Sequence, residues 1–331
     1  MVKSIEHSAA IIYGLSGLTL TPDERSFFTE CNPYGFILFK RNCDTPEQIR
    51  ALTNALRDLL GRDCPILIDQ EGGRVQRMNA PNWRAYPPAR LFGEMAEQQT
   101  LDKALTDLRF NTLQMIEDLQ ACGITVNCTP VADILIPEAH DVIGDRAFSE
   151  DPAITARLAL SVCRHYVQCA MNPIMKHIPG HGRALADSHL ELPVVDTPQD
   201  VLERTDFVPF REIARSDVGH AVWAMTAHVI YSALDKAYPA TISPHIIGEI
   251  IRKSMGFEGV LVSDDLDMKA LSRYGSPADM ALASLEAGCD LALHCSGNLQ
   301  DMLKIAEKLP KISEISRKRL QKSLEFRKLA A

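Results

Sequence analysis

Met171-Asn172-Pro173-Ile174-Met175 is followed directly by Lys176-His177-Ile178-Pro179-Gly180-His181-Gly182, and Asp187-Ser188-His189 comes a few residues later. The first five residues form a short apolar run, which is typical of a strand buried in a parallel sheet. The prolines and glycines that follow end the strand and free the backbone to form a surface loop. This loop carries a lysine, three histidines and an aspartate. Because α/β enzymes place their chemistry where buried strands end, the stretch predicts an active site at the carboxyl end of a parallel sheet.

Eight short apolar runs recur along the chain, with helical patterns between them. The runs are nearly continuous in hydrophobicity, as expected for strands that are buried on both faces. The helical patterns are amphipathic, and Ile49, Leu52, Leu56 and Leu59, for example, share one face. Eight strand–helix repeats predict an α/β fold with a closed (β/α)8 TIM barrel, and a doubly wound sheet is the alternative. The expected strands cover residues 9–14, 35–39, 65–69, 125–131, 172–177, 221–228, 259–264 and 290–294.

Helix starts are marked by a hydroxyl side chain followed by proline, because the hydroxyl caps the helix and proline fits its first turn. Glu24 and Gln48 are expected to complete capping boxes with the hydroxyl groups of Thr21 and Thr45. The hydroxyl residues are Thr21, Thr45, Thr197, Ser243 and Ser276.

Three long connections follow the third, fourth and fifth expected strands, over residues 72–90, 132–152 and 178–198. In a barrel all three emerge at the carboxyl end, so they predict a walled pocket on that side. Residues 98–121 are expected to form the helix between the third and fourth strands.

The composition is that of a globular enzyme, since 46% of the 331 residues are hydrophobic and 24% are charged. No shift in composition divides the chain, so we expect one catalytic domain over residues 1–331, with a helical tail from about residue 299. The part of the tail rich in lysine and arginine, residues 308–328, is expected to be a solvated helix. The net charge of −8 argues against nucleic acid or an anionic membrane as the main partner. We expect a monomer that acts on a small molecule.

Nine cysteines occur without a paired CxxC motif, which argues against a secreted disulfide framework and favours a reducing cytoplasm. Residues 8–20 faintly resemble a secretory signal. Gly14, Ser16 and Gly17 interrupt this run, so a first strand is the better interpretation. No stretch approaches the roughly 20 apolar residues of a membrane span.

Asp69-Gln70-Glu71-Gly72-Gly73-Arg74-Val75-Gln76-Arg77 ends the third strand. A carboxylate and two arginines around paired glycines suit a ligand rich in hydroxyl groups, because Asp69 can accept hydrogen bonds from two neighbouring hydroxyls. The alternative is a turn at the strand end with a structural Asp–Arg pair.

Asp264 ends the seventh strand, within Leu261-Val262-Ser263-Asp264-Asp265-Leu266. A carboxylate that faces a pocket while backed by apolar core suits a nucleophile or an electrostatic stabiliser. Asp265 or Asp267 is instead a candidate cap for the next helix.

The histidine-rich loop admits two mechanisms. In one, Asp187 orients His189, which serves as acid and then as base, because histidine titrates near neutral pH. In the other, His177, His181 and His189 bind a divalent metal with an aspartate. His181 lies between two glycines and is also compatible with a purely structural role. Arg146, in the loop after the fourth strand, either clamps a ligand or pairs with Asp145 or Glu150 at the surface.

Together these stretches resemble the motifs of the family 3 glycoside hydrolases, and within that family the single-domain β-N-acetylglucosaminidases of Gram-negative peptidoglycan recycling. The similarity runs from about Gly14 to the eighth strand, with the motifs in the family's order. The motifs are Asp69-x-Glu71-Gly-Gly-Arg-Val-x-Arg77, Gly144-Asp-Arg146-x-Phe-Ser, Lys176-His-x-Pro-Gly-His-Gly, Asp187-Ser-His189 and Ser263-Asp-Asp-Leu.

The resemblance implies a (β/α)8 barrel and a role for each site residue. Asp264 matches the nucleophile, and His189, supported by Asp187, matches the acid/base. Larger relatives often take their acid/base from a second domain, and none follows the tail here, which favours His189 in that role. The residues that match the sugar-binding positions are Asp69, Arg77, Arg146, Lys176 and His177.

The activity implied is retaining, metal-independent and cofactor-independent hydrolysis of a terminal β-linked GlcNAc, an exo-β-N-acetylglucosaminidase or β-N-acetylhexosaminidase. The implied substrate is GlcNAc linked to 1,6-anhydro-MurNAc, with or without its peptide, in the cytoplasm. Three alternatives remain: a relative that releases glucose or another sugar, a barrel metallohydrolase that uses the loop histidines, and a non-catalytic barrel that binds muropeptides. The loop that carries His189 is expected to swing in only when substrate binds.

Overall fold

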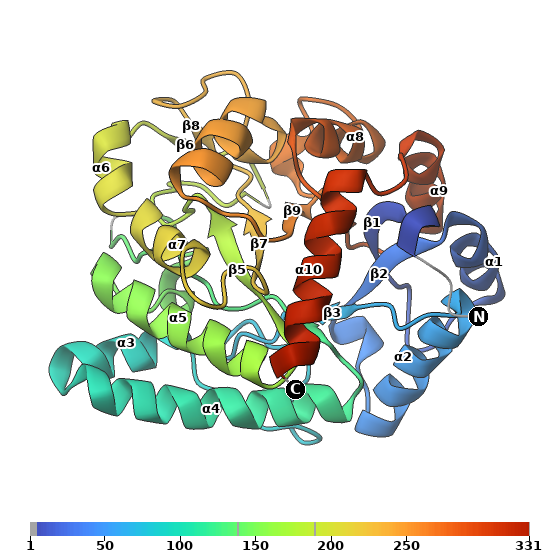
Figure 1. The fold of residues 1–331 in the computed structure, drawn as a ribbon, viewed down its shortest axis with the longest axis horizontal. Coiled ribbons are helices and arrows are strands. Elements are labelled where there is room, and N and C mark those ends of the chain that lie inside the picture. Colours follow the sequence, from blue (N-terminus) through green and yellow to red (C-terminus); the bar gives the residue numbers. More distant parts are fainter. Residues whose placement is uncertain (1–4, 138, 189, 331) are drawn as a thin grey trace.

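Eight parallel strands close into a barrel, and helices cover its outside (Figure 1). The computed structural model describes residues 5–137, 139–188 and 190–330. Because β1 pairs with both β2 and β10, the sheet is closed, which confirms the predicted (β/α)8 barrel and excludes a doubly wound sheet. Every strand of the barrel overlaps one of the predicted runs. In barrel order they are β1 (Ala9–Gly14), β2 (Pro33–Leu38), β3 (Ile66–Ile68), β4 (Val126–Asn127), β5 (Asn172–Ile178), β7 (Trp223–Thr226), β9 (Leu261–Asp265) and β10 (Leu291–His294).

The strands are continuously apolar because both of their faces are buried. Ile11 and Tyr13 of β1 pack outward in the layer shared with the helices, whereas Ile12 between them points into the barrel. Leu67 of β3 likewise lies inside, between the outward-facing residues Ile66 and Ile68. Side chains therefore fill the barrel, as in other barrels of this size.

The helices alternate with the strands and bury one apolar stripe each. In α2 this stripe contains Ile49, Leu52, Leu56 and Leu60, with Leu60 more deeply buried than the predicted Leu59. The helices are α1 (Pro22–Cys31), α2 (Pro46–Leu60), α3 (Ala89–Gln98), α4 (Leu101–Ala121), α5 (Pro152–Gln168), α6 (Gln199–Arg204), α7 (Phe207–Ala214), η5 (Ile246–Ser254), α8 (Pro277–Ala287), α9 (Leu299–Lys308) and α10 (Glu314–Ala330), with the short turns η1 (Ile5–His7), η2 (Lys40–Asn42), η3 (Gly144–Arg146), η4 (Ala240–Ile242) and η6 (Lys269–Leu271).

Most of the predicted helix caps are present. Thr21 and Glu24 form a complete capping box, and Ser276 caps α8 in the same way with Asp279. The predicted box at Thr45 is wrong, because the Gln48 side chain accepts the N–H of Asp44 instead of that of Thr45. Pro198, and not Thr197, precedes the first turn of α6, without a side-chain cap.

The predicted single helix over residues 98–121 is wrong. Two helices, α3 and α4, occupy the region, and the Thr100 hydroxyl accepts the N–H of Lys103 to begin α4 afresh. A two-stranded sheet outside the barrel, β6 (Val194–Val195) with β8 (Ile230–Tyr231), was also not predicted.

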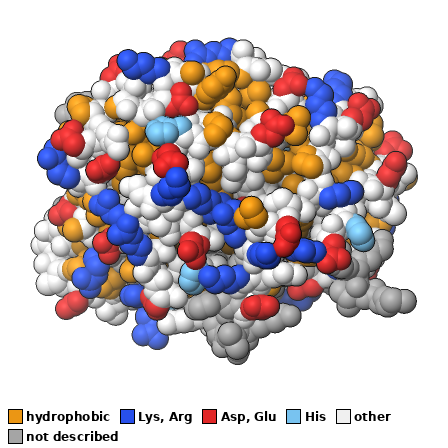
Figure 2. Space-filling view, turned by 45° about the horizontal axis from the view of Figure 1, so that its top comes forward, with side chains coloured by type: hydrophobic (Ala, Val, Ile, Leu, Met, Phe, Trp, Pro, Cys, Tyr) orange, Lys and Arg blue, Asp and Glu red, His pale blue; other side chains and the backbone are white. Residues whose placement is uncertain are grey.

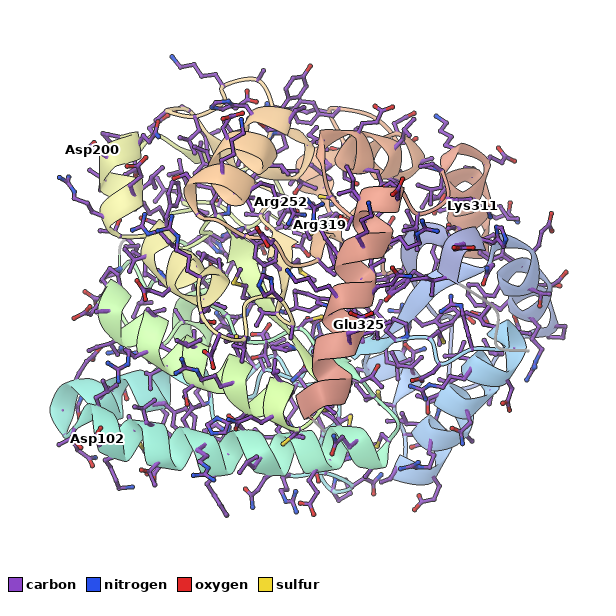
Figure 3. All side chains as sticks on the ribbon, in the orientation of Figure 1. Asp102, Asp200, Arg252, Lys311, Arg319 and Glu325 are labelled. Carbon is purple, nitrogen blue, oxygen red and sulfur yellow. The ribbon has the colours of Figure 1, made fainter. Side chains whose placement is uncertain are left out.

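Helix α10 crosses the amino end of the barrel, so the expectation of a solvated tail is wrong. The Ser323 hydroxyl accepts hydrogen bonds at 2.9 Å from the Asn172 side chain, at the start of β5, and from the Trp223 indole, at the start of β7. Leu320 packs into the cluster that fills the barrel. Arg319 of α10 and Arg252 of η5 approach each other beside this helix (Figure 3) and share Asp290, which is 1% exposed. The helix thus closes the end opposite the site.

The outer surface mixes both signs of charge. Figure 2 shows Lys and Arg side chains interleaved with Asp and Glu side chains on the face in view. Within the described ranges, the molecule has no helix that combines the length and the apolarity needed to cross a bilayer.

Candidate active site

A cavity of about 140 Å³ opens at the carboxyl end of the barrel. Residues of the three long loops wall it, as predicted from their lengths, among them Arg77, Arg146 and Ser188. Six of the residues predicted for the site from the sequence line this one cavity: Asp69, Arg77, Arg146, Lys176, His177 and Asp264.

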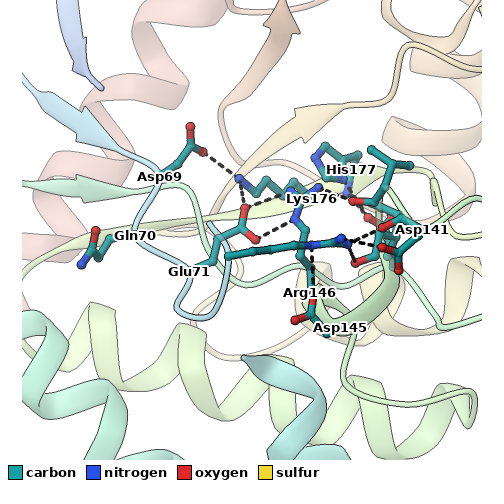
Figure 4. Close-up of polar contacts among 12 residues, drawn as sticks. Asp69, Gln70, Glu71, Asp141, Asp145, Arg146, Lys176 and His177 are labelled. Atoms are coloured by element: carbon teal, nitrogen blue, oxygen red, sulfur yellow. Dashed lines mark hydrogen bonds and ion pairs between the residues drawn. The ribbon is translucent and has the colours of Figure 1, made fainter. Parts of the chain in front are cut away.

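The floor of the cavity is a network of buried charges (Figure 4). Lys176 Nζ, at the end of β5, lies 2.8 Å from Asp69 Oδ1 and 2.6 Å from Glu71 Oε1. Glu71 also receives two hydrogen bonds from Arg146, at 2.8 and 2.9 Å. Arg77 Nη2 donates to the second oxygen of Asp69 at 3.1 Å. Two carboxylates and three cations thus surround the position a ligand would occupy.

These charges keep one another ionised. Burial on its own would raise the pKa of Asp69, but Lys176 and Arg77 outweigh it and hold that pKa well below the ordinary value. In Glu71 burial is likewise outweighed, by Arg146 and Lys176, and the pKa is lowered. Burial would lower the pKa of Lys176, yet Asp69 and Glu71 raise it above its usual range. The site therefore presents fixed charges and preorganised donors and acceptors at neutral pH, which suits a polar ligand.

Asp133 is a third buried carboxylate and contacts two of the histidines. It is 0% exposed and lies 2.7 Å from His177 Nδ1. The backbone N–H of His181 donates to it at 2.6 Å. Burial would raise the pKa of Asp133, but His177 and its other donors lower it. An ionised carboxylate only accepts, so His177 carries a proton on Nδ1 and its ring orientation is fixed.

His181 serves structure more than proton transfer. Burial and the neighbouring His177 lower the pKa of His181 to about 4, so its ring is neutral near pH 7. Its Nε2 lies 3.0 Å from the Ser188 hydroxyl, which joins the loop after β5 to the cavity wall.

Asp264, at the end of β9, lies in the cavity as a carboxylate. Its Oδ1 accepts the N–H of Asp265 at 2.8 Å. Burial would raise the pKa of Asp264, but the imidazoles of His228 and His177 and this N–H hold it below the ordinary value. His228 is fully buried, and its Nε2 lies 3.0 Å from the carbonyl oxygen of Asp265. A carboxylate that stays ionised in a cavity is a competent nucleophile.

The predicted acid/base pair is only partly described. Asp187 lies in the loop after β5, where its carbonyl accepts the N–H of Leu190 at 2.9 Å and that of Glu191 at 3.0 Å. Its neighbour Ser188 lines the cavity. His189 lies outside the described residues, so its position relative to Asp264 stays a prediction.

The metal-binding alternative lacks a preformed site in the part of the chain that the structure describes. No three His, Cys, Asp or Glu side chains converge there as a metal would require. His177 and His181 face each other with ring centroids 5.6 Å apart, but their hydrogen bonds go to Asp133 and Ser188.

Comparison with known proteins places the chain in a family. The model of the glycosyl hydrolase family 3 N terminal domain matches residues 18–326. The chain belongs to glycoside hydrolase family 3. A beta-hexosaminidase from Alkalilimnicola ehrlichii is 40% identical over 287 residues, which cover 86% of this chain and 80% of that protein.

Solved structures agree with this membership in family 3. NagZ from Neisseria gonorrhoeae, in complex with N-trifluoroacetyl-D-glucosamine, superposes with a TM-score of 0.86 and 32% identity over 97% of this chain and 93% of that one. The same gonococcal protein in complex with zinc ion gives a TM-score of 0.84 and 31% identity over the same shares. The chain is therefore a family 3 glycoside hydrolase of the beta-hexosaminidase group, as the motifs indicated.

Glu71, Asp133 and His228 were not singled out as site residues from the sequence. Glu71 and His228 lie two or three residues beyond the carboxyl ends of β3 and β7, and Asp133 lies in the loop after β4. The rule that identified Asp69 and Asp264, a polar residue at the end of a buried strand, applies to them equally. Asp133 was missed because the predicted fourth strand ended at residue 131, two positions earlier.

Proposed function

We propose that this family 3 enzyme is a retaining exo-β-N-acetylglucosaminidase that uses Asp264 as nucleophile and His189 with Asp187 as acid/base. The observation that carries the proposal is the shared cavity: an ionised Asp264 lies with Asp69, Lys176 and Arg146 around a space of about 140 Å³. A small cavity rich in charged donors and acceptors suits one terminal sugar with several hydroxyl groups. The small volume favours removal of single end residues.

In the first step, Asp264 attacks the anomeric carbon while His189 protonates the departing oxygen, which gives a covalent glycosyl-enzyme. In the second step, neutral His189 removes a proton from water, and the water displaces Asp264 with overall retention. Most retaining glycosidases use a second carboxylate for this role. An imidazole does so without placing another negative charge beside Asp264, and Asp187 stabilises the imidazolium that forms.

The sugar-binding roles follow from the network at the cavity floor. Asp69 accepts from sugar hydroxyls, while Arg77, Arg146 and Lys176 donate to hydroxyl or carbonyl oxygens. His177 directs Nδ1 at Asp133, so its Nε2 is the ring atom that would accept from a sugar hydroxyl. No cofactor takes part.

We further propose that the substrate is GlcNAc linked to 1,6-anhydro-MurNAc, with or without its peptide, in cytoplasmic peptidoglycan recycling, and that the enzyme acts as a monomer. The resemblance of the motifs supports this substrate, as does the GlcNAc derivative named in the gonococcal complex. The nine cysteines are all free in the structure, which supports a reducing compartment.

The test is turnover of chromogenic β-glycosides of GlcNAc, GalNAc and glucose, with and without EDTA. We expect β-GlcNAc to be the preferred substrate, EDTA to have no effect, and the first sugar released to be the β-anomer by proton NMR. Release of the α-anomer contradicts retention, and preference for the glucoside contradicts the substrate. Loss of activity in EDTA with recovery on added zinc supports the metallohydrolase instead.

A further inference from the structure

Arg74 lies outside the cavity but grips the loop that carries Arg146. Its Nη1 donates to Asp141 Oδ2 at 2.8 Å, and its Nη2 donates to the carbonyl of Ile143 at 3.0 Å. Its Nε lies 3.0 Å from Asp145 Oδ1. One guanidinium from the loop after β3 thus holds three points of the loop after β4.

The turn that carries Arg74 also contacts Arg146 directly. Glu71, three residues before Arg74, receives two of the three hydrogen bonds that the Arg146 guanidinium donates, and the carbonyl of Val142 receives the third. The turn between them is closed by the Glu71 N–H donating to the carbonyl of Val75 at 2.9 Å. In Figure 4, Glu71 lies on one side of Arg146, with Asp141 and Asp145 on the other. Residues 141–146 are therefore held by two charged side chains of one turn, Glu71 and Arg74.

Gly144 leaves space for the contacts between Arg74 and residues 141–145. Its φ is +43°, and a Cβ there would lie 2.2 Å from Asp141 Oδ1 and 2.9 Å from Arg74 Nη2. Any side chain would force the ion pair apart as well as strain the backbone. Ile143 anchors the middle of the segment in an apolar cluster with Val131 and Ala147. The Asp141 side chain is 83% exposed and that of Asp145 is 43% exposed, so these two positions depend on their charged contacts.

We propose that Arg74 is a positioning residue for sugar recognition, which acts by fixing the loop segment that presents Arg146 to the cavity. This inference rests on the proposed function, in which Arg146 binds the sugar. A binding group must be held within a fraction of an ångström to be effective, and Glu71 alone fixes the tip of Arg146 without fixing its backbone. The contacts of Arg74 at Asp141, Ile143 and Asp145 supply that second constraint together with the burial of the Ile143 side chain.

The experiment compares Arg74→Ala with Arg84→Ala. Arg84 lies in the same loop, is 44% exposed against 39% for Arg74, and pairs with two carboxylates of α4, Glu117 and Asp118, away from the cavity. For hydrolysis of a chromogenic β-GlcNAc, Arg74→Ala should raise KM about 5- to 10-fold with kcat within about twofold, because binding contacts made equally in ground and transition state affect KM. Arg84→Ala should leave both constants unchanged, with both variants melting at the same temperature.

A double-mutant cycle tests the route through Arg146. In an Arg146→Ala background, Arg74→Ala should change KM by less than about twofold, since the group it positions is gone. Arg74→Lys should restore part of the loss, because one ammonium retains the charge but reaches fewer of the acceptors. Gly144→Ala should raise KM in the same direction as Arg74→Ala.

The proposal is overturned if Arg74→Ala has the same KM as the wild type, whether or not its kcat and melting temperature fall. It is also overturned if Arg74→Ala raises KM as much in the Arg146→Ala background as it does in the wild type. If the wild type hydrolyses none of the β-glycosides, the proposed function fails first. The dissociation constant of GlcNAc itself, measured by calorimetry for wild type, Arg74→Ala and Arg84→Ala, then decides the positioning role separately.

Discussion

Lys176 Nζ lies 2.8 Å from Asp69 Oδ1, although the two residues are 107 positions apart in the chain. The barrel brings them together because the carboxyl ends of all its parallel strands meet at one rim, and only β4 separates β3 from β5. A buried ion pair of this kind adds little net stability, since each charge loses its hydration. Its value here lies in presenting an ionised carboxylate and an ammonium to a ligand at fixed positions.

Asp69→Asn tests whether the charge of the Asp69 carboxylate contributes to sugar binding. The amide keeps an acceptor oxygen but loses the charge, and a hydrogen bond to a charged group contributes about 1.5–3 kcal/mol. We expect KM for β-GlcNAc to rise roughly 10- to 100-fold, with a smaller change in kcat, measured by steady-state kinetics. Asp63→Asn, which alters a surface pair with Arg57, is the control and should change neither constant. Equal KM values for wild type and Asp69→Asn would show that Asp69 does not bind the sugar.

Asp264→Asn tests the nucleophile. The amide has nearly the same shape but cannot form the glycosyl-enzyme, so kcat should fall by about 10⁴-fold or more. Intact-protein mass spectrometry with a slowly hydrolysed substrate should show a sugar adduct on the wild type and none on the variant. Asp267→Asn, three residues on, should retain the adduct. A variant at Asp264 that still accumulates the adduct would remove the central claim of the mechanism.

His189→Ala tests the acid/base. Loss of a general acid and base slows both steps, by about 10²- to 10⁴-fold for a substrate with a poor leaving group. With a good leaving group the first step needs little protonation, so added azide should accelerate the second step and yield a β-glycosyl azide. A His189→Ala enzyme as active as the wild type at pH 7, or one that azide does not rescue, argues for another proton donor.

The fold was predictable because its signals are local. Near-continuous apolar runs mark strands buried on both faces, and threonine or serine before proline marks helix starts, so all eight barrel strands were located. The role of α10 was not predictable. Its sequence is rich in lysine and arginine, and only the tertiary contacts of Leu320 and Ser323 show that one face closes the barrel.

The site was predictable to the extent that its residues fall in contiguous motifs. Asp69, Lys176 and Asp264 end strands, and the sequence therefore indicated their shared location. Asp133 and His228 act through contacts with residues far along the chain, at His177 and at Asp265. Such pairings depend on three-dimensional proximity, which a single sequence does not record.

The stability of the molecule should carry a specific pH signature from Asp265. Burial and the neighbouring Asp267 raise the pKa of Asp265 to about 6. A raised carboxyl pKa favours the folded state while the group is protonated, so this contribution to stability is lost as pH rises from about 4 to about 6. Asp265→Asn, which keeps the acceptor oxygen, should therefore gain stability relative to the wild type across that window, by at most about 3 kcal/mol.

Asp267→Asn is the matched control for this measurement. Burial would raise the pKa of Asp267, but its contact with His294 lowers it below the ordinary value. A lowered carboxyl pKa contributes stability that is fully present above about pH 4 and is lost as pH falls below it, so the deficit of this variant relative to the wild type should shrink below about pH 4. Urea unfolding at several pH values between about 2.5 and 7 covers the windows of both carboxyl groups. If the stabilities of the two variants, each relative to the wild type, depended on pH in the same way, the opposite pKa shifts of Asp265 and Asp267 would be contradicted.

Asp290→Ala tests whether α10 is held by charge at the closed end of the barrel. Asp290 Oδ2 lies 2.8 Å from Arg252 and Oδ1 lies 2.9 Å from Arg319, and Oδ2 also accepts the N–H of Leu261 at 2.9 Å. Removing it leaves two guanidinium groups and a buried N–H without this partner, so the free energy of unfolding should fall by about 3–5 kcal/mol. Glu314→Ala removes an exposed pair with Lys318 on the same helix and should change it by less than about 0.5 kcal/mol. Because the site lies at the opposite end of the barrel, the folded fraction of Asp290→Ala should have the same kcat and KM as the wild type. If Asp290→Ala lowers the free energy of unfolding no more than Glu314→Ala does, packing holds the helix and this charge cluster does not.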